Sequence, residues 1–172
     1  MRSKRGVVAV MLGILIAGAV LAPSAAAASN DACSYLTSAQ VSAVVGIPVA
    51  AGAYVTPEFK QTCTWNPAGT PTKDVRSVTL YVQSADAYDS GKKLMEQMQV
   101  MAKMRKADAS QWSAASVSGI GDDAYYVNVG TATSLMFKKG SVSFKVSVYS
   151  GLPRPEKQAM EKALAMKVLA KL

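Results

Sequence analysis

The chain has 172 residues, 50% of them hydrophobic and 17% charged, and its formal net charge is +8. This composition excludes an intrinsically disordered chain, and the length fits one domain with a substantial core. The sequence contains no histidine and only two cysteines. It therefore excludes a Ser-His-Asp triad, a Cys-His nucleophile, a histidine-ligated zinc or haem and a four-cysteine metal cluster, and we expect no cofactor.

The first predicted element is an export signal over residues 1–28. Its positive start consists of Arg2, Lys4 and Arg5. An apolar run from Val7 to Leu21 follows, and small residues lead up to Ala28. A charged start, an apolar run and a small-residue end are typical of a secretory signal peptide, and 15 residues are fewer than the roughly 20 that cross a bilayer.

Cleavage is expected after Ala28, with Ala27 as the close alternative, and leaves residues 29–172 as a single domain. The signal contains three basic residues and no acidic one, so the remaining 144 residues have a formal charge of +5. No later stretch reaches 18 apolar residues, so we expect no transmembrane segment in the mature chain. The predicted location is the periplasm or the extracellular medium.

Cys33 and Cys63 both remain after cleavage. In an exported protein one pair of cysteines favours a disulfide, here closing a loop of about 30 residues and stabilising the fold by roughly 3–4 kcal/mol on the chain-entropy model. The alternative is a redox-active pair. Reactive pairs usually lie close together as Cys-x-x-Cys, so the spacing favours a structural bridge.

The first half of the domain is predicted to contain two helices. A Thr37–Gln40 capping box and Gly46 delimit the first helix. The expected elements are a helix at 38–45, an extended stretch at 49–55, a strand at 59–65, a loop at 66–71, a strand at 75–82 and a long helix from Ser84 or Asp86 to Lys106.

The second half is predicted to contain three strands and a final helix. Residues 107–119 show no clear period and are expected to be a connection, with Trp112 as a buried anchor. The expected elements are a turn at 119–123, strands at 124–129, 134–137 and 142–149, a hairpin turn at 138–140, and a helix from Pro155 to the end of the chain.

The predicted fold class is α+β. Strands that follow one another through short turns predict a mainly antiparallel sheet. Polar residues alternate with apolar ones in the strands at 75–82 and 142–149, which predicts one solvated face. We therefore expect the long central helix, the C-terminal helix and the short N-terminal helix to pack on the other side.

Methionines occur at every third position of the long helix, namely Met95, Met98, Met101 and Met104. Thioethers are soft ligands for Cu(I). On a 3.6-residue helix, however, this spacing turns by about 60° per step, so the four do not share one face, although Met95 and Met98 could meet. The pattern favours core packing. A flexible apolar binding groove and a Cu(I) site through Met95 and Met98 are the alternatives.

Two further groups are candidates for chemistry. Asp122 and Asp123 are adjacent, and adjacent residues entering a strand point to opposite faces, so they favour a turn over an acid–base pair. A carboxylate-dependent envelope hydrolase is the enzymatic alternative. Tyr125, Tyr126 and Tyr149 lie near predicted strand ends and are candidates for lining a small-ligand pocket. We predict no catalytic residue.

Lysines and arginines form a basic rim on the long helix and a basic hairpin at Lys138 and Lys139. A solvated surface is favoured, with contact to anionic lipid or polysaccharide as the alternative. No aromatic-basic motif accompanies them, so nucleic acid is not an expected partner.

Three short motifs resemble those of small exported bacterial proteins. They are Cys33-Ser34-Tyr35-Leu36-Thr37, Cys63-Thr64-Trp65 and Gly119-Ile120-Gly121-Asp122-Asp123-Ala124-Tyr125. The resemblance covers most of residues 33–149 and is to domains of unknown function, including actinobacterial envelope lipoproteins and kinase sensor-like domains. It implies an α+β sandwich-like fold and a Cys33–Cys63 disulfide, and it transfers no catalytic residue. The chain differs from the lipoproteins because no lipobox precedes Cys33.

These observations predict an exported, non-enzymatic binding or accessory domain. Its expected partner is an envelope protein, a glycan or a small ligand.

Overall fold

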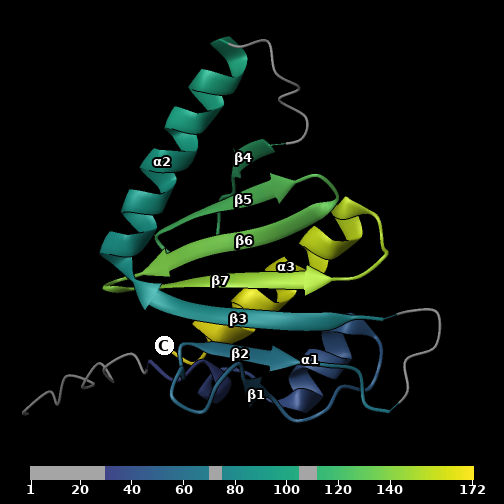
Figure 1. The fold of residues 1–172 in the computed structure, drawn as a ribbon. Coiled ribbons are helices and arrows are strands. Elements are labelled where there is room, and N and C mark those ends of the chain that lie inside the picture. Colours follow the sequence, from purple (N-terminus) through teal and green to yellow (C-terminus); the bar gives the residue numbers. More distant parts are fainter. Residues whose placement is uncertain (1–29, 70–74, 105–111) are drawn as a thin grey trace, which may run out of the picture.

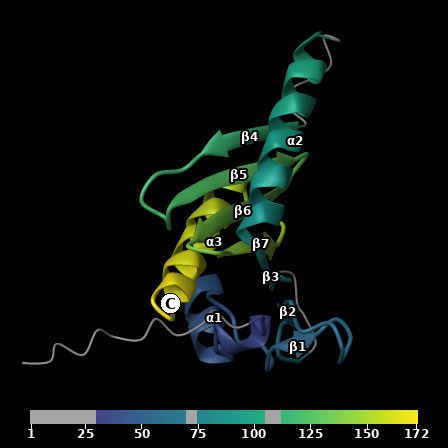
Figure 2. The same ribbon diagram turned by 90° about the vertical axis from the view of Figure 1, so that its left-hand side faces the viewer.

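The computed structural model describes residues 30–69, 75–104 and 112–172 as a single seven-stranded antiparallel sheet with helices on both faces (Figures 1 and 2). In spatial order the strands are β1 (Ala53–Tyr54), β2 (Thr62–Trp65), β3 (Ser77–Ser84), β7 (Val142–Tyr149), β6 (Ala132–Lys139), β5 (Asp123–Val129) and β4 (Trp112–Ser116). The helices are a short 3₁₀ turn η1 (Ala32–Ser34), α1 (Ser38–Val45), α2 (Ala85–Met104) and α3 (Arg154–Leu169). The predicted signal peptide lies outside the described residues, as do residues 70–74 and 105–111.

The long helix α2 connects two strands that are far apart in the sheet. It follows β3 in the middle and leads to β4 at the edge, passing over β7, β6 and β5 (Figure 1). Every neighbouring pair is antiparallel, and four such steps separate β3 from β4, so these two strands run in the same direction. A helix that connects parallel strands must cross one face of the sheet.

The hydrophobic core lies on the face that α1 and α3 cover. The inward positions of β3, β7 and β6 are fully or nearly fully buried there against helical side chains such as Val41, Val45, Leu164 and Val168. Helix α1 begins and ends as predicted. The Thr37 hydroxyl accepts the Gln40 N–H at 3.2 Å, and Gly46 closes the helix with a φ of +75°.

The α+β class and the antiparallel sheet are confirmed, but α2 packs on the opposite face from α1 and α3 (Figure 2). Adjacent residues of β5 show this, because Tyr125 contacts Tyr88 of α2 whereas the Tyr126 hydroxyl donates to the Gln158 carbonyl of α3 at 2.7 Å. The expectation that all three helices share one side was wrong for α2. It relied on β3 and β7, whose second face is polar, whereas the second face of β5 and β6 carries the apolar side chains of Tyr125, Val127 and Met136.

The sheet also has one more strand than predicted. Residues 112–116 were expected within a connection, yet they pair with β5 as the edge strand β4, with Ala114 opposite Val127. Their sequence, Trp-Ser-Ala-Ala-Ser, contains no β-branched residue and only one residue that favours strands, Trp112, so the local strand signal was weak and the pairing with β5 determines their conformation. Strand β6 begins two residues earlier than expected, at Ala132.

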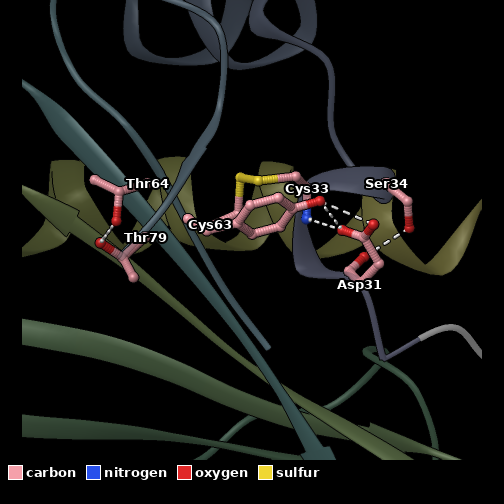
Figure 3. The surroundings of a disulfide bond; sticks show 7 residues. Asp31, Cys33, Ser34, Cys63, Thr64 and Thr79 are labelled. Atoms are coloured by element: carbon pink, nitrogen blue, oxygen red, sulfur yellow. Dashed lines mark hydrogen bonds between the residues drawn. A yellow bond between two sulfur atoms is a disulfide. The ribbon is translucent and has the colours of Figure 1, made fainter. Parts of the chain in front are cut away.

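The predicted disulfide between Cys33 and Cys63 is present, with Cα atoms 5.0 Å apart and a sequence separation of 30 residues (Figure 3). It joins η1 to β2. Asp31 supports the same junction, because its carboxylate accepts the Cys33 N–H at 3.0 Å and the Tyr54 hydroxyl at 2.8 Å. The N-terminal segment is thereby fixed to the sheet.

Within the described ranges, none of the helices combines the length and the apolar composition that a bilayer crossing requires.

Candidate functional site

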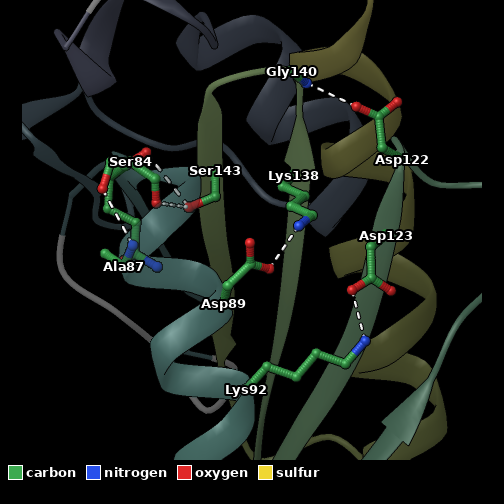
Figure 4. Close-up of polar contacts among 10 residues, drawn as sticks. Ser84, Ala87, Asp89, Lys92, Asp122, Asp123, Lys138, Gly140 and Ser143 are labelled. Atoms are coloured by element: carbon green, nitrogen blue, oxygen red, sulfur yellow. Dashed lines mark hydrogen bonds and ion pairs between the residues drawn. The ribbon is translucent and has the colours of Figure 1, made fainter.

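Three lysine–aspartate pairs gather around the first turns of α2 and the hairpin beside them. Figure 4 shows the Lys92–Asp123 and Lys138–Asp89 pairs, together with the hydrogen bond between Asp122 and the Gly140 N–H. The ammonium–carboxylate distances are 2.6 Å for Lys92–Asp123, 2.6 Å for Lys138–Asp89 and 2.7 Å for Lys139–Asp122. The first two pairs connect α2 to β5 and β6. The Ser84 hydroxyl caps the helix by accepting the Ala87 N–H at 3.2 Å. These contacts anchor the N-terminal half of α2 to the sheet.

The charges of these pairs are mutually stabilised. The hydrogen bond from Lys139, followed by that from the Gly140 N–H, lowers the pKa of Asp122 below its usual value. Burial alone would raise the pKa of Asp123, but the hydrogen bond from Lys92 and nearby positive charge outweigh it and the pKa is lowered. Asp122 and Asp123 are therefore ionised over the neutral pH range, and their ion pairs with Lys139 and Lys92 have a structural role.

Two tyrosines fill the space beneath the anchored part of α2. The rings of Tyr88 and Tyr125 meet edge to face with centroids 5.3 Å apart. Lys138 lies 5.3 Å above the Tyr88 ring and Lys92 lies 5.8 Å above the Tyr125 ring. Burial raises the pKa of both hydroxyls, so both stay neutral.

Beyond Lys92, α2 leaves a groove between itself and the sheet. The groove has a volume of about 390 Å³, within the range of small-molecule sites. Leu94 and Met98 at its opening are 57% and 40% exposed, so large apolar side chains meet solvent there. The groove is lined by Gly91, Leu94, Met95, Met98, Tyr125, Val127, Val129, Ala132, Thr133, Ser134, Met136 and Lys145.

The strand register determines the order of side chains on the groove floor. One row across the sheet runs Tyr125, Met136, Lys145, Tyr81 and Thr62. The next runs Val127, Ser134, Ser147, Thr79 and Thr64. In both rows the residues on β5 and β6 are mainly apolar, whereas those on β7, β3 and β2 are polar. The groove floor therefore changes from apolar under α2 to polar towards β2.

The four methionines singled out in the sequence lie in different environments in the structure. Met95 and Met98 line the groove, and Met136 of β6 joins them there. Met101 lies at a separate hollow on the outer side of α2, and Met104 is 77% exposed. Three thioethers from two elements therefore face one cavity. No group of three or more histidine, cysteine, aspartate or glutamate side chains suited to a metal ion occurs among the described residues.

The three candidate tyrosines are separated as well. Tyr125 lines the groove, Tyr126 faces α3, and Tyr149 lies 51% exposed at the end of β7. Burial, and then the charge of Glu161, raises the pKa of Tyr126 to about 12.

Sequence reasoning missed Val127, Met136 and Lys145 as groove residues. The alternation in 132–139 contained a signal for Met136, because Ser134, Met136 and Lys138 share the face opposite to the buried Leu135 and Phe137.

Comparisons of the chain with models of protein families, with curated proteins and with solved structures give no match. The class of protein and its function must therefore be inferred from the fold and from the groove. They define a disulfide-linked α+β domain with an open, mainly apolar cavity between one helix and the sheet.

Proposed function

We propose that this chain is an exported, non-enzymatic binding domain whose ligand occupies the groove between α2 and the sheet. The observation that supports it is the groove itself, because a concave, mainly apolar surface of this volume with a few polar groups is typical of small-molecule sites. Here Leu94, Met98 and Val129 stay substantially exposed at the opening. Methionine suits such a surface, since its flexible thioether adapts to ligands of different shape.

Export agrees with the oxidised cysteine pair and with the signal-like segment at residues 1–28. When the full chain is expressed in a bacterial host with a secretory pathway, the protein recovered outside the cytoplasm should begin at Ser29. Intact-mass measurement checks this, and a recovered protein that retains Met1 would contradict it.

The binding proposal is tested with the neutral fluorescent probe N-phenyl-1-naphthylamine. We expect saturable binding to the wild-type protein and at least tenfold weaker binding to Ala132→Trp, because a large ring at this exposed floor position fills the groove. Ala163→Trp is the matched control, since Ala163 is exposed on α3 on the other face. Equal affinity in all three proteins would exclude the groove as the binding site.

Cu(I) binding is the second candidate function, and the presence of Met95, Met98 and Met136 in one cavity favours it. Anaerobic Cu(I) titration against bicinchoninate tests it with the triple Met→Leu variant of these residues and with Met166→Leu on α3 as the control. Leucine keeps the apolar volume, so the triple variant should lose copper and still bind the naphthylamine. If the triple variant binds copper as the wild type does, the metal function is ruled out.

A further inference from the structure

Among the residues that the structure describes, Lys145 is the only charged one that lines the groove. It lies on β7, with Met136 beside it on β6 and Tyr81 beside it on β3. It is partly buried, and no carboxylate among the described residues forms an ion pair with it. A partly desolvated cation without a counter-ion at the edge of an apolar cavity attracts an anionic group of a ligand.

The lysines closer to the N-terminal end of α2 have carboxylate partners, unlike Lys145. Lys92 and Lys138 face the same side of the sheet, and each forms an ion pair with an aspartate at 2.6 Å. Lys145 is next to Lys138 in the grid of side chains, on the neighbouring strand and one row further along. The charges on this face are thus neutralised within the protein up to the position where the groove begins.

The surroundings of Lys145 also suit a polar head group. Across β7 and β3 the floor presents the hydroxyls of the partly buried Thr79 and Tyr81, and α2 leads away from these two strands after its first turns (Figures 1 and 2). In the opposite direction, towards Met136 and Val127, the floor is apolar and lies under α2. An elongated ligand would therefore meet apolar contacts at one end and a cation with hydroxyls at the other.

We propose that the ligand is a single-chain amphiphile with one anionic head group, such as a fatty-acid carboxylate, with its chain under α2 and its head group paired with Lys145. This inference rests on the proposed function of the groove. The volume of about 390 Å³ is at the lower end of the range for ligand sites, which favours one chain over the two chains of a phospholipid.

The test compares three ten-carbon ligands by isothermal titration calorimetry below their aggregation concentrations: decanoate, decanol and decylamine. We expect decanoate to bind the wild-type protein about tenfold more tightly than decanol, because only its carboxylate forms a partly desolvated ion pair with Lys145. Decylamine should bind most weakly, because its ammonium group is repelled by Lys145. Lys145→Gln should reduce decanoate affinity about tenfold and leave decanol affinity unchanged. Lys145→Arg should retain the preference for decanoate.

Lys162→Gln, on the exposed face of α3, is the control for the change in net charge and should bind as the wild type does. Equal binding of decanoate and decanol, with no effect of Lys145→Gln, would overturn the head-group assignment and leave the groove intact. If none of the three ligands binds and the neutral naphthylamine also fails, the proposed function itself fails. Sedimentation of the protein with phosphatidylglycerol vesicles, without binding of monomeric decanoate, would overturn the inference in favour of a membrane surface.

Discussion

The glycine-rich turn before β5 shows how single residues determine the geometry near the groove. Gly121 has a φ of +59°, and a Cβ atom there would lie 2.2 Å from the Lys138 carbonyl oxygen. This close approach lets the Asp122 N–H donate to that carbonyl at 2.8 Å and lets the Asp122 carboxylate accept the Gly140 N–H at 2.7 Å. The motif therefore has a structural cause, namely the docking of the turn onto the β6–β7 hairpin.

Replacing Gly121 by alanine should destabilise the protein much more than the same change at Gly140. Both glycines have a φ of +59°, but a Cβ at Gly140 meets nothing within 4 Å. Gly140→Ala should cost about 1 kcal/mol of unfolding free energy from the backbone conformation alone, and Gly121→Ala at least ~2 kcal/mol more from the clash. Urea denaturation measures both, and similar losses would show that the contact with Lys138 is not important.

Glu161 is a buried carboxyl group on α3. Its two oxygens accept the Val148 N–H at 3.1 Å and the Thr133 hydroxyl at 3.3 Å. Burial raises its pKa to about 7, against the opposing effects of these hydrogen bonds and of the Lys157 charge. The folded protein thus binds the proton of this group more tightly than the unfolded chain does.

This pKa predicts a particular pH dependence. A carboxyl pKa that is higher in the folded state contributes stability below its unfolded value of about 4.5, and this contribution is lost as the pH rises through 7. Relative to Glu161→Gln, the wild-type protein should lose roughly 2–3 kcal/mol of unfolding free energy between pH 4.5 and pH 8. Urea denaturation series at several pH values check this, and parallel curves for the two proteins would contradict it.

At the scale of elements, the N-terminal segment and β2 depend on the disulfide. The bridge closes a loop of 30 residues, which corresponds to roughly 3–4 kcal/mol on the chain-entropy model. We expect Cys33→Ala/Cys63→Ala to lose about that amount in urea denaturation. Reduced wild-type protein is the control, because it keeps both side chains. A loss below ~1 kcal/mol in both would show that packing alone holds η1 against β2.

Helix α2 shows where sequence patterns predicted structure and where they did not. Its existence and its Ser84 cap followed from local signals, as did the capping box of α1 and the alternation of β3. Its position did not, because the strands used for the prediction, β3 and β7, are polar on the face that α2 partly covers. Tyr125, Val127 and Met136 determine the contact, and their common face is apparent only from the pairing of β5 with β6.

The groove was predictable in part. A flexible apolar groove on the methionine helix was one alternative from the sequence, and Met95 and Met98 do line a cavity. Lys145 gave no local signal, because a lysine in an alternating strand is ordinarily a solvated outward residue. Its importance comes from the strand order, which places β7 beside β6 and its lysine at the end of the apolar floor.

At the scale of the whole molecule, the two faces of the sheet differ in how they are closed. The face under α1 and α3 is a filled core, whereas α2 is anchored at its N-terminal half and leaves a groove beneath the remainder. The disulfide and the core provide a rigid base for this open side. The arrangement suits a domain that binds a ligand between a fixed sheet and one overlying helix.

The most direct test of the groove as the ligand site is methyl NMR of the protein labelled in its methionine methyl groups, titrated with decanol. The methionines of the groove, Met95, Met98 and Met136, should shift with a single saturable affinity, and Met160 and Met166 on α3 should not. Shifts confined to Met160 and Met166, or no shift in any methionine at saturating decanol, would contradict the assignment of this groove as the binding site.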